Sequence, residues 1–580
     1  MLKQLAGCVR EYKRPTILTL IFIVGEAVIE TIIPFITANL VNRIKAGASI
    51  ESVMEVGLLL IIMAAISLVC GGLAGFTCAK ASTGFAKNLR SDLFHRIQTY
   101  SFENIDKFSS SSLVTRMTTD VTNVQMAFMM LIRIAIRSPL LLIFSTVMAF
   151  VMGGKLAFVF VVVIPILAFG LLAIGKKAMP AFRSVFKKYD RLNESIEENV
   201  RGMRVVKGFS REEYEKQKFN TAADNIRKDF TKAECIVALN TPLMNLCMYI
   251  NMVVVLLVGS KLAITSGGSA LDVGQISGML TYGMQILMSL MMLSMIYVMV
   301  TMSAESAKRI CEVLEEEPSL KEPENPVMEV KDGSIEFKNV NFKYSARAKK
   351  YALSDIDLSI RSGMTVGIIG GTGSSKSSLV QLIPRLYDVT EGAVLVGGED
   401  VRSYDIPTLR SAVAMVLQKN VLFSGTIKDN LRWGNETATD EEIREACRLS
   451  QADEFIQTFP DKYDTYIEQG GSNVSGGQKQ RLCIARALLK KPKILILDDS
   501  TSAVDTKTDA LIRAGFKNYI PDTTKIIIAQ RIASVEDADL IIVMDNGSIS
   551  AAGTHEDLLQ SSDIYREVYE QQTKGGNENE

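Results

Sequence analysis

The stretch Gly370 to Ser378, with the sequence Gly-Gly-Thr-Gly-Ser-Ser-Lys-Ser-Ser, has the composition of a phosphate-binding loop. It follows the apolar run Val366 to Ile369 and opens a helical pattern. Glycines let backbone N–H groups turn toward a phosphate, the helix start adds partial positive charge, and Lys376 adds a full one. The hydroxyl of Ser377 can ligate Mg²⁺. The predicted binding residues of this loop are Gly370, Thr372, Gly373, Ser374, Ser375, Lys376, Ser377 and Ser378.

A second apolar run, Ile494 to Leu497, ends in two carboxylates, Asp498 and Asp499. A carboxylate at the end of a buried strand beside a phosphate-binding loop is placed to hold Mg²⁺ through water. We therefore predict that Asp498 is a metal ligand. The loop itself departs at one position from the usual pattern, because Ser375 stands where a second glycine is common.

A third motif precedes this strand. Ser475, Gly476, Gly477 and Gln478 open a helix expected over Lys479 to Lys490. Ser475 is a suitable N-cap, and the first N–H groups of the helix would form a second anion site. The chain's own phosphate loop does not need that site, so its ligand is expected to come from elsewhere.

These motifs belong to the second half of a chain whose first half is apolar. A membrane-spanning helix needs about 20 mainly apolar residues. Six runs qualify, namely Pro15 to Val41, Val53 to Ala79, Met129 to Met152, Leu156 to Gly175, Ala238 to Ile264 and Gln275 to Met302. Two long polar, helical connections carry most of the basic residues of this half, whereas Thr265 to Val273 has none. The positive-inside rule places those connections and both termini in the cytoplasm.

The proline-rich acidic stretch from Glu315 onward predicts a linker, after which short β-branched runs alternate with helical patterns. The runs predicted as strands are Val366 to Ile369, Ile494 to Leu497, Lys525 to Ile528 and Leu540 to Met544. The expected fold class is an α-helical membrane domain with six transmembrane helices plus an α/β P-loop domain with a largely parallel sheet. The expected boundaries are 1–314 for the membrane domain, 315–333 for the linker, 334–572 for the nucleotide-binding domain and 573–580 for a disordered tail.

Composition excludes several functions. Lys+Arg 64 balances Asp+Glu 64, so there is no basic excess of the kind that accompanies nucleic-acid binding. The eight cysteines include no C-x-x-C pair, which argues against a zinc site or a disulfide scaffold. The apolar first half leads us to expect the lipid bilayer as a partner.

Gln418 lies between the loop and the Val-Ser-Gly-Gly-Gln segment, and a Ser-Ala-Val-Asp stretch follows Asp499. With these residues, the order of the motifs resembles that of a half-transporter of the ABC exporter family. The resemblance covers nearly the whole chain and implies ATP and Mg²⁺ as cofactors. It implies that Tyr344 stacks on adenine, that Gln418 links Mg²⁺ and the attacking water to the membrane half, and that Asp505 touches an opposite subunit. The segment from Ser475 to Gln478 would cap the γ-phosphate of the opposite loop. Short coupling helices are expected near Asn104 to Ser110 and Met203 to Phe209.

Two further positions depart from the family pattern. A Glu usually follows the Mg²⁺ aspartate and polarises the attacking water, and a His usually contacts the γ-phosphate; this chain has Asp499 and Gln530. The side chain of Asp499 is one methylene shorter than that of glutamate, and the side chain of Gln530 lacks the positive charge of an imidazolium. With Gln418, they form the predicted catalytic set. The pattern resembles the hydrolysis-impaired half of bacterial heterodimeric multidrug exporters. That resemblance implies a multi-pass protein of the cytoplasmic membrane, with the ATP-binding domain in the cytoplasm. It also implies a homologous partner subunit and a small hydrophobic or amphipathic substrate.

Other functions share these motifs. A homodimer with two slow sites, an exporter dedicated to a peptide or lipid, and an ATP-gated membrane regulator all remain open on sequence alone. The sixth run carries a methionine stripe at helical spacing, formed by Met284, Met288, Met291, Met295 and Met302. Glu26 and Glu30 lie one turn apart in the first run, as do Arg133 and Arg137 in the third. Substrate contact and structural packing are both open for these residues.

Overall fold

The computed structural model describes residues 1–266, 271–345, 348–499 and 504–574. The chain forms two compact units. The helical unit comprises Met1–Gln98 and Ser110–Glu316, and the α/β unit comprises Thr99–Ser109 and Glu317–Glu580. Two features predicted from the sequence lie outside the described residues: Ser502 and Ala503 of the Ser-Ala-Val-Asp stretch, and nearly all of the tail at 573–580.

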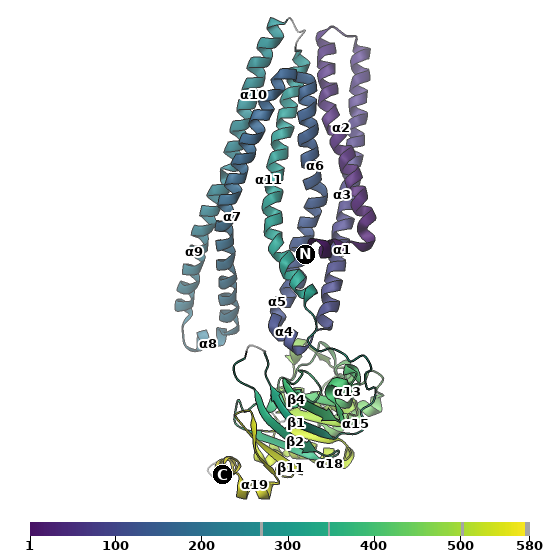
Figure 1. Ribbon diagram of the computed structural model, residues 1–580, viewed down its shortest axis with the longest axis vertical. Coiled ribbons are helices and arrows are strands. Elements are labelled where there is room, and N and C mark those ends of the chain that lie inside the picture. The colour runs from purple at the N-terminus through teal and green to yellow at the C-terminus, as the bar shows by residue number, and fades with distance from the viewer. Residues whose placement is uncertain (267–270, 346–347, 500–503, 575–580) are drawn as a thin grey trace. The chain divides into compact units, whose positions relative to one another are not determined.

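Long helices run alongside one another in the helical unit (Figure 1). Those that contain the predicted apolar runs are α2 (Lys13–Lys45), α3 (Ile50–Gln98), α6 (Val121–Gly153), α7 (Phe158–Arg201), α10 (Asn240–Thr265) and α11 (Val273–Glu315). Within the described residues, five helical stretches are long and apolar enough to cross a membrane. One of them, Ser110–Phe182, holds both α6 and the start of α7, so the six predicted runs are accounted for.

These helices continue well beyond their apolar runs. The 49 residues of α3 correspond to a length of about 74 Å, against a bilayer core of about 30 Å. Pro180 lies inside α7 without ending it. The polar extensions of α3 and α7 are therefore continuous with their spans. Among the described residues, the other α-helices of this unit are three short ones, α1 (Leu2–Gly7), α5 (Ser110–Thr115) and α8 (Met203–Gly208), and the longer α9 (Glu212–Ala238).

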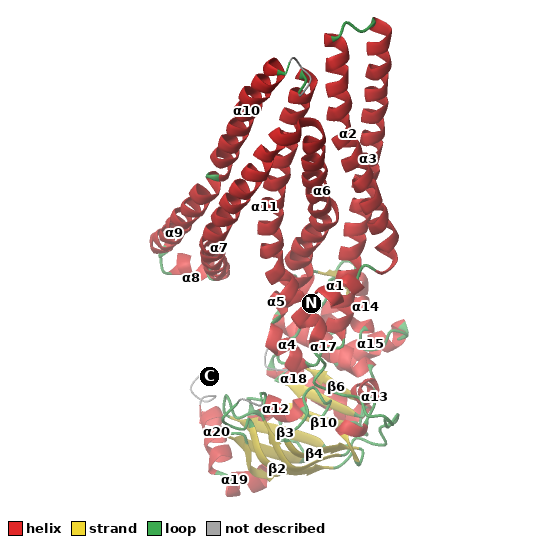
Figure 2. Ribbon diagram, turned by 45° about the horizontal axis from the view of Figure 1, so that its top comes forward, coloured by secondary structure: helices red, strands yellow, loops and turns green. Residues whose placement is uncertain are grey.

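The α/β unit contains a six-stranded sheet in the order β12-β11-β3-β10-β9-β6. Its strands are β3 (Thr365–Gly370), β6 (Val413–Val416), β9 (Ile494–Asp498), β10 (Thr524–Ile528), β11 (Leu540–Asp545) and β12 (Ser548–Gly553). All neighbours pair in parallel except β11 with β12. Figure 2 shows these strands in yellow among red helices. The four apolar runs predicted as strands correspond to β3, β9, β10 and β11.

A second, four-stranded antiparallel sheet has the order β2-β1-β4-β5, with β1 (Ile335–Phe342), β2 (Leu353–Ile360), β4 (Glu391–Val396) and β5 (Glu399–Asp400). The sequence did not predict it. Its strands contain register shifts, and Asn339 and Asp355 adopt positive φ values of 46° and 49°. Such bulges interrupt the two-residue alternation by which a strand is predicted.

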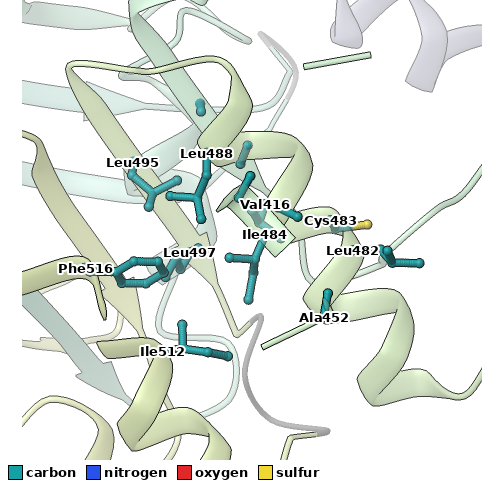
Figure 3. Close-up of a cluster of buried hydrophobic side chains, with 14 of the residues drawn as sticks. Val416, Ala452, Leu482, Cys483, Ile484, Leu488, Leu495, Leu497, Ile512 and Phe516 are labelled. Atoms are coloured by element: carbon teal, nitrogen blue, oxygen red, sulfur yellow. The ribbon is translucent and has the colours of Figure 1, made fainter. Parts of the chain in front are cut away.

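The remaining elements of this unit are α4 (Phe102–Phe108), α12 (Lys376–Gln381), α13 (Ile406–Ala412), β7 (Gly425–Thr426), α14 (Ile427–Arg432), α15 (Asp440–Leu449), α16 (Asp453–Ile456), β8 (Tyr466–Ile467), α17 (Gly476–Leu489), α18 (Thr506–Tyr519), α19 (His555–Ser561) and α20 (Asp563–Lys574). Helix α17 packs on the sheet through an apolar cluster (Figure 3). Leu488 of α17, Leu497 of β9 and Phe516 of α18 are buried in it. This core fixes the end of β9, where Asp498 lies.

Candidate functional site

The phosphate-binding loop joins β3 to α12 and is organised around Lys376. The Lys376 ammonium donates to the carbonyl oxygens of Gly370 and Gly371, both at 2.8 Å. Ser374 is buried, and its hydroxyl donates to the same Gly371 oxygen at 2.9 Å. Burial lowers the pKa of Lys376, while Asp498 and Asp499 act in the opposite direction. The lysine is thus held across the mouth of the loop.

Ser375 adopts a left-handed conformation, with φ +70°. Only glycine enters this region without cost; for other residues the penalty is about 1–2 kcal/mol. The observation explains why a glycine is usual here.

The two predicted Mg²⁺ ligands on β9 and α12 lie together. The Ser377 hydroxyl donates to Asp498 Oδ1 at 3.0 Å. Burial raises the pKa of Asp498, and the nearby Asp499 adds to that shift, whereas Ser377 and Lys376 oppose it. Hydroxyl and carboxylate oxygens are the hard donors that Mg²⁺ prefers. The donor set therefore fits Mg²⁺, with the amide oxygen of Gln418 as the third predicted ligand.

The three predicted catalytic residues also converge. Gln530, which follows β10, donates from Nε2 to Asp499 Oδ2 at 2.7 Å. Gln418, after β6, donates from Nε2 to the same oxygen at 3.4 Å. Asp499 itself has a positive φ of 48°. The two glutamine amides are thus directed at the oxygen that would have to accept a proton from water.

Tyr344, expected to stack on adenine, lies beside the loop. Its hydroxyl is 2.7 Å from Ser378 Oγ and donates to Gln381 Oε1 at 3.3 Å. Its ring meets that of Tyr387 edge to face, with centroids 5.1 Å apart. The aromatic face needed for a base is therefore anchored to α12.

The segment predicted to act on an opposite loop begins α17. The Ser475 side chain accepts from the Gln478 N–H at 3.3 Å, and the Gln478 side chain accepts from the Ser475 N–H at 2.9 Å. This capping box is well formed, and Ser475 and Gly476 are exposed. Among the described residues, no hydrogen bond joins this segment to the chain's own loop. Asp505 caps α18 by accepting from the Thr508 N–H at 2.9 Å.

Helix α4 belongs to the α/β unit although it lies far away in the sequence. Asn104 Nδ2 donates to the Glu317 carbonyl at 3.0 Å, and the Tyr387 hydroxyl donates to Asp106 Oδ2 at 2.8 Å. Through Tyr387, α4 is linked to Tyr344. The sequence predicted a coupling helix in this region but not the role of Tyr387, which no motif marks. A second short helix, α8, lies where the other coupling helix was predicted.

In the helical unit, the charged pairs of α2 and α6 meet. Arg137 donates to Glu30 Oε1 at 2.5 Å and lies 3.5 Å from a Glu26 oxygen. These contacts show a Glu–Arg bridge at one of the positions left open by the sequence. Met284 and Met288 of the stripe remain about half exposed, at 53% and 55%.

Comparison with known proteins agrees with this geometry. Residues 16–290 match the family model of the ABC transporter transmembrane region, and residues 353–502 match that of the ABC transporter. An uncharacterized ABC transporter ATP-binding protein of Bacillus subtilis (strain 168), YfiB, is 36% identical over 555 residues, which are 96% of each chain. This chain belongs to the ABC transporter family. YknU of the same organism is 33% identical over 83% of this transporter and 82% of its own length.

Among solved structures, a bacterial Atm1-family ABC exporter with ATP bound has a TM-score of 0.84 at 23% identity, over 97% of this transporter and 99% of that chain. The predicted fold class is confirmed: this is a half-transporter in which a helical membrane domain is fused to an ATP-binding domain. As a member of its family, the transporter is a multi-pass membrane protein, acts as a dimer and couples ATP to transport.

Proposed function

We propose that this ABC transporter exports drug-like or amphipathic compounds across the bacterial cytoplasmic membrane as one half of a heterodimer. Its own ATP site binds nucleotide but hydrolyses it slowly, while its Ser475-to-Gln478 segment completes the active site on a homologous partner. The contact between Asp499 and Gln530 carries this proposal. ATP with Mg²⁺ would be held by the loop around Lys376, with Ser377, Asp498 and Gln418 near the metal and Tyr344 on the adenine.

The chemistry of Asp499 supports slow hydrolysis. A general base must come within about 2.6–3.2 Å of the proton that it removes, and a misplacement of about 1 Å can cost about 100-fold. Asp499 is one methylene shorter than glutamate, and its Oδ2 already accepts from Gln530 at 2.7 Å. An oxygen that accepts an amide hydrogen bond is a weaker base. Gln530 cannot supply the positive charge that an imidazolium would place on the γ-phosphate.

The geometry of α17 supports a partner subunit whose ATP site differs from the one on this chain. Its capping box is intact, and its first residues are exposed, as an anion-binding helix start should be. In a homodimer this intact segment would act only on a second impaired loop. In a heterodimer it would act on a loop that carries Glu and His at the positions of Asp499 and Gln530.

The helical unit supports transport of amphipathic compounds. Flexible methionine side chains of α11 are exposed beside the ion pair of Arg137 and Glu30. Methionine adapts to ligands of varied shape, which suits a broad range of substrates. The positive-inside distribution of basic residues supports a cytoplasmic position for the α/β unit, which is the side from which export would proceed.

Purification of the tagged transporter from its own membranes tests the pairing. We expect a homologous half-transporter in equal amount, with Glu and His at the positions aligned to Asp499 and Gln530. Inside-out vesicles that contain both subunits should accumulate an amphipathic dye when ATP is added. Recovery of this chain alone as an active homodimer would contradict the heterodimer. Failure of the vesicles to accumulate any amphipathic compound would contradict the export function.

A further inference from the structure

A pocket of about 490 Å³ lies among α2, α6 and α11 of the helical unit. Its charged lining residues are Glu30, Arg133 and Arg137, and methionines of α6 and α11, including Met288 and Met292, form much of the rest of its wall. It combines ionisable groups with a flexible apolar surface. That combination is unusual in a membrane domain, where ionisable groups are rare and generally paired.

Two of the three charged residues neutralise each other. Arg137 donates to Glu30 at 2.5 Å and lies 3.5 Å from Glu26, which is on the preceding turn of α2. Glu30 is thus engaged by an arginine and is not available to a second cation. Gln285, another lining residue, donates to the Glu30 carbonyl oxygen at 3.3 Å and accepts from the Ser145 hydroxyl at 2.8 Å. The polar groups at this end of the pocket are therefore held by one another.

Arg133 lies one helical turn before Arg137 on the same side of α6. Its side chain is exposed, and among the described residues it forms no ion pair and no hydrogen bond. Its guanidinium nitrogens lie 3.9 Å from the position that a Cβ on Gly75 of α3 would occupy, so a small residue leaves room beside it. Arg133 therefore presents an uncompensated positive charge to the pocket.

We propose that this pocket binds an amphipathic anion. The carboxylate, sulfonate or phosphate of the ligand pairs with Arg133, and its apolar part lies on the methionines of α6 and α11. A guanidinium forms two parallel hydrogen bonds to such an oxyanion, and methionine accommodates apolar groups of different shapes. The proposal deepens the proposed function, on which it rests, by naming the charge of the transported class. A free amphiphilic anion and an anionic lipid both carry such an oxyanion on an apolar body.

Binding to the full-length transporter in nanodiscs of phosphatidylcholine, without nucleotide, tests the proposal. The probes are dansyl-labelled undecanoate, its uncharged amide and the corresponding amine. We expect the anionic probe to bind at least about tenfold more tightly than the other two, because a hydrogen bond to a charged group is involved. Arg133→Gln should remove that preference, whereas Arg133→Lys should retain much of it. Arg14→Gln, at an exposed arginine at the start of α2, is the matched control and should change nothing.

A second variant is expected to change the affinity for the anionic probe in the opposite direction. Glu30→Gln removes a carboxylate that engages Arg137 and should therefore tighten binding of the anionic probe. Binding of the uncharged probe reports whether each variant is folded. An Arg133→Gln variant that binds the anionic probe as well as the parent does would overturn the proposal, as would equal affinity of the parent for all three probes.

Nanodiscs that contain phosphatidylglycerol distinguish the two sources of anion. If this lipid competes with the anionic probe in the parent but not in Arg133→Gln, the natural ligand is a lipid headgroup. If the lipid does not compete in the parent, the natural ligand is a free amphiphile. Failure of this inference is separable from failure of export. Vesicles in which the Arg133→Gln variant pumps an anionic dye as well as the parent does would refute the anion site alone, whereas Arg133-dependent binding without any pumping would refute export alone.

Discussion

The side-chain amide of Gln530 donates a 2.7 Å hydrogen bond to Asp499 Oδ2. These residues come from the ends of neighbouring parallel strands, β10 and β9, whose carboxyl ends meet at one edge of the sheet. The contact links two positions at which this ABC transporter departs from the pattern of its family. One substitution shortens the base, and the other directs an uncharged donor at it. Together they support the proposal that this site binds ATP and hydrolyses it slowly.

Restoring both residues should restore hydrolysis. The double variant Asp499→Glu with Gln530→His lengthens the base and introduces a group that can be cationic. In a dimer of two such chains, each Ser475 segment faces a repaired loop, so ATPase activity should rise about 10- to 100-fold. Phosphate release from the purified transporter measures it. Asp545→Glu, an exposed aspartate at the end of β11, is the control and should leave the rate unchanged. A double variant no faster than the parent would contradict this account of the two substitutions.

Ser375→Gly should relax the loop. Because Ser375 has φ +70°, glycine removes a penalty of about 1–2 kcal/mol without loss of a side-chain contact that the loop uses. Thermal unfolding of the ATP-binding domain should shift upward by a few degrees, and a fluorescent ATP analogue should bind no less tightly. Ser374→Gly is the matched control and should lower stability, because the buried Ser374 hydroxyl bonds to Gly371. Equal shifts for both variants would show that backbone strain at Ser375 is not the cause.

Tyr387 should couple nucleotide binding to α4. Its hydroxyl bonds to Asp106 and its ring packs edge to face on Tyr344. Tyr387→Phe keeps the ring and removes the bond, so ATP affinity should stay unchanged while stimulation of ATPase by a transported compound falls about fivefold, the size of a coupling of ~1 kcal/mol. The assay uses the complex with its partner subunit. Tyr519→Phe, at an exposed tyrosine of α18, should have no effect. Full stimulation in Tyr387→Phe would mean that α4 receives its signal by another route.

The sequence predicted the parts of this molecule that follow local patterns. The β-branched runs gave β3, β9, β10 and β11 because buried parallel strands are continuously apolar. The loop around Lys376 and the cap at Ser475 are local arrangements of backbone and side chain. The structure contains both the loop and the cap at the predicted positions. The six apolar runs were found because lipid allows few other compositions.

Other features depend on contacts between residues far apart in the chain. The antiparallel sheet containing β1 was missed because positive-φ residues such as Asn339 break its alternation. The placement of α4 in the α/β unit depends on Tyr387 and Asp106, which are 281 positions apart. The sequence grouped Asp499 and Gln530 in one site, but the hydrogen bond between them was found only in the structure. For Glu30 and Arg137, the sequence left open both substrate contact and structural packing. Their ion pair became evident only from the packed helices of the structure.

The ATPase rate of this chain purified without any other subunit tests the central claim most directly. We predict a low rate that Asp499→Asn scarcely changes, measured beside the Asp499→Glu, Gln530→His double variant as a positive control for folding and dimerisation. Rapid turnover by the unmodified chain that Asp499→Asn abolishes would contradict the claim that this site is impaired.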